Sequence, residues 1–83
     1  MTIRLVRTRH YQGTLWEVAR TDENIRAYVA HRSSLGEPPF GLSVFVPQDR
    51  ASNAQQIQDW DAQIKRLLKL PDDVVVIDGG GTK

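Results

Sequence analysis

One stretch of this 83-residue chain repeats its apolar residues at helical spacing, and this stretch limits the fold more than any other feature. From Ala54 onward, the apolar positions follow one another at steps of three and four, which places them on one side of a helix. They are Ile57, Trp60, Ile64, Leu67 and Leu68. Ser52 or Asp49 can cap the start of the helix, and Pro71 disfavours helical geometry at Leu70. The sequence therefore predicts one amphipathic helix, which can cover one face of a sheet.

The first half of the chain has the turn residues and the short alternation that are typical of strands. Turn signals at residues 12–13, 21–24 and 33–41 separate four expected strands, which cover residues 3–7, 15–20, 25–31 and 42–46. A fifth strand, over residues 74–77, is expected after the helix, and its uninterrupted apolar run favours a well-buried position over an exposed edge. We therefore expect an α+β domain of two layers. Its mainly antiparallel five-stranded sheet, in the order β-β-β-β-α-β, would carry the helix on one face.

The register of the first hairpin decides which side chains share a face of this sheet. If the turn centres on Gln12 and Gly13, Arg9 lies opposite Trp16 and Arg7 lies opposite Val18. The face for the helix to bury then collects Ile3, Leu5, Trp16, Val18, Ile25, Ala27 and Val29. The other face carries Arg4, Val6, Thr8, Leu15, Glu17, Arg26, Tyr28, Arg32 and Phe45. Because the single helix leaves nothing to cover this second face, we expect it to bind a partner.

Length and composition limit the architecture and the location of the protein. A chain this short forms one domain, which we expect over residues 1–78, with a flexible glycine-rich tail over residues 79–83. The chain has no cysteine, which excludes disulfides, thiolate nucleophiles and cysteine metal sites. Its longest apolar run has four residues, far short of the ~20 that span a bilayer. With no visible signal segment, we expect a cytoplasmic protein without a membrane partner.

The titratable residues do not form a recognisable catalytic set. His10 and His31 point to opposite faces in the expected register, so they are not expected to share a metal ion. Asp59 and Asp61 lie about 200° apart around the helix, so they do not face each other as an acid–base pair would. We therefore expect no enzyme activity, no catalytic or metal-binding residues and no cofactor.

The residues expected to contact a partner come from the uncovered face and from the loop before the fourth strand. The loop centre, Glu37-Pro38-Pro39-Phe40, is semi-rigid, and it either presents Phe40 to a partner or anchors the loop with it. The predicted partner-binding residues are Arg4, Arg26, Tyr28, Arg32, Phe40 and Phe45.

These features favour a non-catalytic protein-binding module, which would act through an uncovered sheet face or edge. A small inhibitor, an adaptor or an accessory protein of the kind that mobile elements encode fits this description, and pairing into a homodimer across the open face is compatible with it. The alternative is a nucleic-acid-binding protein. Six arginines in the first 32 residues, with Tyr11, Trp16 and Tyr28 between them, could contact phosphates and stack on bases. Against this alternative, residues 33–83 carry a net charge of −2, and the computed pI is only about 8.2.

Overall fold

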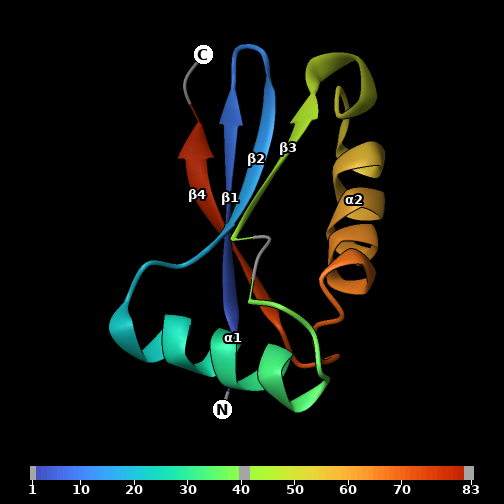
Figure 1. The fold of residues 1–83 in the computed structure, drawn as a ribbon. Helices are drawn as coiled ribbons and strands as arrows, with labels where there is room; N and C mark the ends of the chain where they lie inside the picture. Colours follow the sequence, from blue (N-terminus) through green and yellow to red (C-terminus); the bar gives the residue numbers. More distant parts are fainter. Residues whose placement is uncertain (1, 40–41, 82–83) are drawn as a thin grey trace.

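The chain folds into a four-stranded mixed sheet with two α-helices (Figure 1). A computed structural model describes residues 2–39 and 42–81. The elements follow in the order β1 (Arg4–His10), β2 (Gly13–Val18), α1 (Asp22–Ser34), β3 (Ser43–Pro47), the short 3₁₀ helix η1 (Gln48–Arg50), α2 (Ala54–Leu67) and β4 (Val75–Gly81). Neither helix of the described residues is long and apolar enough to cross a membrane. The α+β class is confirmed, whereas the predicted five antiparallel strands with one helix are wrong in number and direction.

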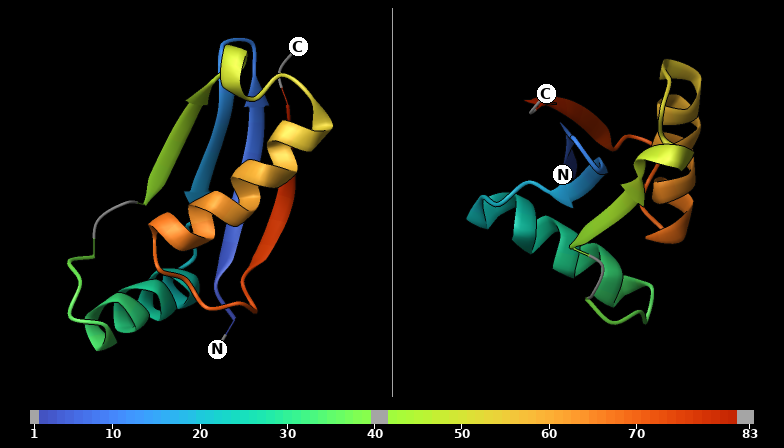
Figure 2. Two further views of the ribbon diagram at one scale, coloured as in Figure 1. Left: turned by 90° about the vertical axis from the view of Figure 1, so that its right-hand side faces the viewer. Right: turned by 90° about the horizontal axis from the view of Figure 1, so that it is seen from above.

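The strand order explains where α2 must lie. The sheet has the order β3-β2-β1-β4, in which β2 is antiparallel to both of its neighbours and β4 is parallel to β1. Strands β3 and β4 therefore form opposite edges, and the chain between them has to travel across the whole sheet. The segment after η1 brings the chain to the β4 side, α2 runs diagonally back over one face toward β3, and residues 68–74 return to the start of β4 (Figure 2, left). The sequence correctly predicted this helix and its role as the cover of one face.

The main error concerns residues 25–31, which were expected to form a strand but lie within α1. The Thr21 hydroxyl accepts a hydrogen bond of 3.3 Å from the Asn24 N–H and so caps the helix. Asp22 and Glu23 follow in the first turn, where negative charge is favourable at the positive end of the helix dipole. The segment that was interpreted as a turn is thus the start of a helix.

Helix α1 does not cover a sheet face; it lies across the end of the sheet where β1 starts and β2 ends (Figures 1 and 2). Its buried residues are Asn24, Ala27, Tyr28 and Arg32. The Asn24 side chain accepts a hydrogen bond from the Arg4 N–H (2.8 Å) and donates to the carbonyls of Arg4 (3.0 Å) and Ala19 (2.9 Å). One buried amide therefore fastens α1 to the ends of both central strands.

The first hairpin turns at Tyr11 and Gln12, one residue earlier than predicted. Arg9 therefore lies opposite Thr14, and Trp16 lies opposite Arg7 instead of Arg9. Each predicted pair is shifted by two residues. Because side chains alternate between faces with a period of two, a shift of two leaves the side chains of β1 and β2 on their predicted faces.

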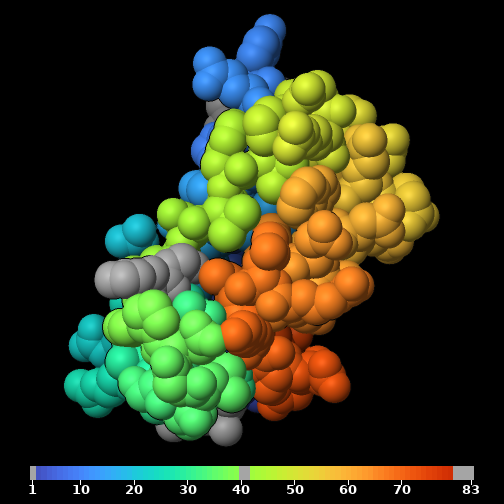
Figure 3. Space-filling model, turned by 45° about the vertical axis from the view of Figure 1, so that its right-hand side comes forward, coloured from blue at the N-terminus to red at the C-terminus, as the bar shows by residue number. Residues whose placement is uncertain are grey.

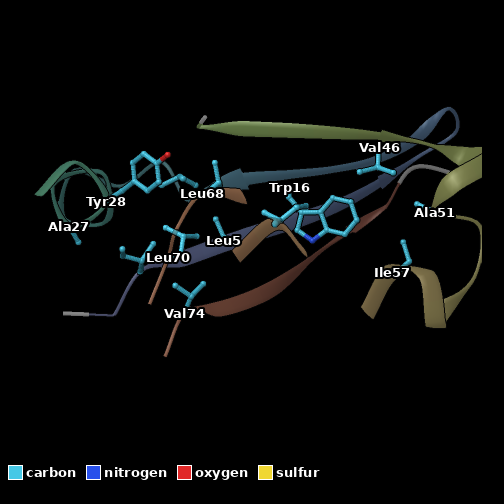
Figure 4. Packing of buried hydrophobic residues seen from close by; sticks show 13 residues of the cluster. Leu5, Trp16, Ala27, Tyr28, Val46, Ala51, Ile57, Leu68, Leu70 and Val74 are labelled. Atoms are coloured by element: carbon cyan, nitrogen blue, oxygen red, sulfur yellow. The ribbon is translucent and has the colours of Figure 1, made fainter. Parts of the chain in front are cut away.

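The core lies between α2 and the sheet, with α1 closing one end (Figure 4). Trp16 lies at its centre, among the buried side chains Ile3, Leu5, Val18, Val46, Ile57, Ile64, Leu68, Leu70 and Val74. Asp61 of α2 accepts hydrogen bonds from the Trp16 indole N–H and from Arg7, both at 2.6 Å. These bonds pair the indole N–H and the guanidinium under the helix and fix which side of α2 faces the sheet.

One residue of the predicted helix stripe lies outside the core. Leu67 is 60% exposed, although its spacing placed it among the buried residues. Around a helix, position 67 lies about 80° away from the direction shared by Ile57, Ile64 and Leu68, so it points past the sheet.

Strand β4 also differs from the prediction, because it forms an edge of the sheet although a well-buried position was expected. It continues beyond Ile77 as far as Gly81, which pairs with Arg9. The expected domain boundary at Asp78 thus falls inside the strand. Thr82 and Lys83 of the expected tail lie outside the described residues.

Candidate functional site

The candidate site is the sheet face opposite α2, which we call the open face. Strand pairing and alternation place on it Arg4, Val6, Thr8 and His10 of β1, Leu15 and Glu17 of β2, Phe45 of β3, and Val75 and Ile77 of β4. Helix α2 lies on the other side of the sheet, and α1 lies at the end of the sheet where β1 starts (Figures 1 and 2). Side chains of α2 and of the segment before it cover that other side of the sheet (Figure 3).

Large apolar side chains are exposed on the open face. Phe45 is 49% exposed, Val75 46% and Ile77 41%, while Val6 and Leu15 between them are half-buried. An antiparallel sheet that only faces water normally carries polar residues on that side. The open face is therefore more apolar than solvation alone requires.

A shallow hollow lies at the hairpin end of the open face. It encloses about 550 Å³ and is lined by His10, Tyr11, Gln12, Leu15 and Phe45. Tyr11 is 83% exposed at the tip of the hairpin, which projects beyond the end of α2 (Figure 3). A Cβ on Gly13 would lie 2.6 Å from the Phe45 ring and 2.2 Å from the Val46 carbonyl oxygen. Glycine at this position thus lets the Phe45 ring lie flat over the strand, at the wall of the hollow.

The charges of the open face lie at its margin. Arg4 is exposed beside Val75 at the end near α1. Glu17 forms an ion pair of 3.6 Å with Arg20, so its charge is partly balanced within the chain. Arg4 is left as the cation that a partner can pair with.

The predicted partner-binding residues are not all brought together. Arg4 and Phe45 lie on the open face, as expected. Arg26 is exposed, but it belongs to α1 and not to the sheet. Tyr28 and Arg32, expected on the same face, are only 0% and 7% exposed in α1. Phe40 lies outside the described residues.

Tyr28 and Arg32 have structural surroundings that explain their burial. Arg32 donates to the carbonyls of Pro38 (3.0 Å) and Leu68 (2.8 Å), and so ties α1 to the following loop and to the end of α2. The partial negative charge at the ends of two helices favours a cation there. Burial raises the pKa of the Tyr28 phenol, and the nearby Arg32 charge opposes this shift in part.

The sequence did not identify Val75 and Ile77 as surface residues, and it named Tyr11 only for the nucleic-acid alternative. Val75 and Ile77 belong to an apolar run that was expected to be buried on both sides. Their alternation with Val74 and Val76, which point into the core, was the available signal. It could not be interpreted without the strand order, because an edge strand and a central strand have the same side-chain period.

In residues 2–39 and 42–81, no group of three or more His, Cys, Asp or Glu side chains is placed to hold a metal ion. Comparison with protein-family models, curated proteins and solved structures finds no match to this chain.

Proposed function

We propose that this protein is a non-catalytic protein-binding module that takes its partner on the open face. The observation that carries the proposal is the exposure of Phe45, Val75 and Ile77 on one side of the sheet. Apolar patches that remain exposed on a small domain mark interaction surfaces more often than chance, because exposing them to water is unfavourable.

The chemistry of the face describes the partner. Its centre is apolar, its hollow has two aromatic side chains at Tyr11 and Phe45, and its margin offers the Arg4 guanidinium. A matching partner presents apolar side chains, one of which fits the hollow, and a carboxylate near Arg4. Inhibitors, adaptors and accessory proteins all need only such a contact to occlude or bridge a larger protein.

Nucleic-acid binding, the alternative, has weaker support in this arrangement. Trp16 and Tyr28, which were expected to stack on bases, are buried in the core. Nucleic-acid affinity of the expected kind would fall by orders of magnitude between about 50 and 200 mM salt. Tight, salt-sensitive binding of DNA or RNA that is lost in Arg4→Glu would favour this alternative over the proposal.

The test compares two exposed apolar residues on opposite sides of the molecule. Phe45→Glu places a charge at the hollow, whereas Leu67→Glu places the same charge on α2, away from the open face. We expect Phe45→Glu to lose the partner that the wild-type protein retains from a native lysate, and Leu67→Glu to keep it. Equal thermal unfolding of both variants checks the fold. Retention of the same partner by Phe45→Glu would contradict the proposed surface.

A further inference from the structure

Over Val75–Ile77, the outer edge of β4 lacks the features that usually prevent an edge strand from pairing with another chain; the one irregularity of the strand lies further on, between Asp78 and Gly81. Such edges are commonly protected by lysine, proline, a bulge or short length. The seven residues Val75–Gly81 contain neither lysine nor proline, and Asp78 is their one charged residue. The other edge, β3, is shorter and ends at Pro47, after which η1 turns the chain away. The two edges are thus unequal, and β4 is the one open to pairing.

Backbone direction identifies the groups that are available on β4. The Val75 N–H donates to the Ile3 carbonyl at 3.1 Å, so Val75 directs its backbone groups toward β1. Successive residues of a strand direct their backbone groups to opposite sides. Val76 therefore directs its N–H and C=O outward, away from the sheet. In the described part of the chain, no strand lies on that side.

We infer that β4 pairs antiparallel with β4 of a second copy of this chain, about a twofold axis that passes beside Val76. This inference rests on the proposed protein-binding role and names a partner for it. In this register Val76 and the partner's Val76 exchange both backbone hydrogen bonds. Val75 lies opposite the partner's Ile77, and Ile77 opposite the partner's Val75.

A second copy of the chain fits this strand edge because the side chains of the strand match those of an identical strand that runs antiparallel to it. Val75, Val76 and Ile77 are all apolar and β-branched, so the segment has the same character on either side of Val76. Cross-strand pairs of β-branched residues stabilise antiparallel strands. A twofold axis makes the Val75–Ile77 contact twice, on the open face, where both side chains are now exposed.

Pairing in this way also enlarges the proposed binding surface. The twofold axis is perpendicular to the sheet, so both open faces lie on the same side of one eight-stranded sheet. The two copies of α2 lie together on the opposite side. The apolar side chains at the β4 edge of one copy then continue those of the other, while each hollow beside Phe45 remains accessible.

The strand edge sets the expected strength of this contact. In this register only Val75, Val76 and Ile77 of each copy lie opposite β4 of the other, over about 10 Å, and a stable interface usually buries about 800 Å² on each partner. An edge contact is smaller than that, so we expect reversible association that depends on concentration. The mass in sedimentation equilibrium should increase from 9.4 kDa toward twice that value between about 10 µM and about 1 mM protein.

Amide hydrogen exchange reports the pairing at the residue that makes it. The Val75 amide is bonded within the chain, so it should be protected at every concentration. The Val76 amide should exchange rapidly in dilute protein and become at least about tenfold slower as the dimer forms. Rapid exchange of the Val76 amide at the highest concentration would overturn the inference, even if the protein associates by another surface.

Two double variants test the register itself. Val75→Glu with Ile77→Lys puts opposite charges across the twofold axis, whereas Val75→Lys with Ile77→Lys puts like charges there. Both replace the same two exposed side chains, and because Arg4 lies beside Val75, thermal unfolding of each variant checks that it is folded. We expect the first to associate and the second to remain monomeric. Equal association of the two variants would overturn the proposed register.

The outcomes distinguish this inference from the proposed function. If the like-charge variant is monomeric and still retains a partner that Phe45→Glu loses, the open face binds another protein and β4 pairs as inferred. If the wild-type protein is monomeric at every concentration, the pairing of β4 is refuted, and the open face is judged by the Phe45→Glu comparison alone.

Discussion

At the residue scale, the hydroxyl of Thr14 is a polar group that the core of the described residues leaves without compensation. Its side chain is fully buried in β2, and within the described part of the chain its hydroxyl has no hydrogen-bond partner. A buried hydroxyl without a partner loses its hydration and gains nothing in return.

We therefore expect Thr14→Val to stabilise the protein, because valine has the same shape and no polar atom. The gain in the free energy of unfolding should be about 1–2 kcal/mol. Urea denaturation measures it, with Thr8→Val as the control, since Thr8 is half-buried on the open face. A loss of stability in Thr14→Val would mean that the hydroxyl is bonded in solution.

At the residue scale, alternation alone correctly placed Arg4 and Phe45 on the uncovered face. It failed for Tyr28 and Arg32, because their burial depends on how α1 docks against the end of the sheet. An arginine that donates only to backbone carbonyls, as Arg32 does to Pro38 and Leu68, has no partner that the sequence identifies. Contacts of this kind become visible only when the elements are assembled.

At the element scale, α1 and α2 explain why one helix was predicted and the other was missed. Helix α2 buries an apolar stripe against a sheet face, so its spacing is visible in the sequence. The buried side of α1 includes Asn24 and Arg32, which hides its helical period from a count of apolar residues. The better signal was the cap, in which Thr21 precedes two acidic residues.

The end of α2 is stabilised by a motif that offers a second prediction. Lys69 has a left-handed backbone (φ 54°), and the bonds Leu70 N–H to Lys65 O (2.8 Å) and Lys69 N–H to Arg66 O (3.1 Å) close the last turn. Such a position favours glycine. The Lys69 ammonium also donates to Glu37 and so holds the pKa of that carboxyl below its usual range.

We expect Lys69→Gly to be more stable than Lys69→Ala by about 1 kcal/mol, because only glycine adopts this backbone without strain. Both variants lose the contact with Glu37, so the comparison isolates the backbone. In both variants the pKa of Glu37 should return upward. In the wild-type protein the Lys69–Glu37 pair stabilises the fold above the usual glutamate pKa, and this contribution is lost as the pH falls; the variants should lack this pH-dependent loss. Thermal unfolding and NMR titration measure the two effects. Equal stability of the two variants would contradict the assigned backbone.

At the scale of the whole molecule, strand order determines which surface is left for a partner. Because β3 and β4 are opposite edges, the connection between them covers one face, with α2 lying diagonally across it, and α1 closes the end of the core. The sequence predicted one covered and one uncovered face, although it had one strand too many and one helix too few. The assignment of the hairpin side chains to the two faces stayed correct despite the error in the turn, because the register shift was an even number of residues. The position of β4 could not be derived, since a parallel edge strand and a parallel central strand differ only in their neighbours.

The accessibility of the open face is the central claim, and the absence of cysteine from the chain allows a direct measurement of it. Three single variants can each be labelled with a thiol reagent in dilute protein. They are Phe45→Cys on the open face, Ile64→Cys on the buried side of α2 and Leu67→Cys on the exposed side of α2. We expect Phe45→Cys to react within about tenfold of the rate of Leu67→Cys, and Ile64→Cys to react slower by orders of magnitude, because its labelling requires the core to open. If Phe45→Cys reacts as slowly as Ile64→Cys, the chain itself covers this face, and the account of it as a binding surface is wrong.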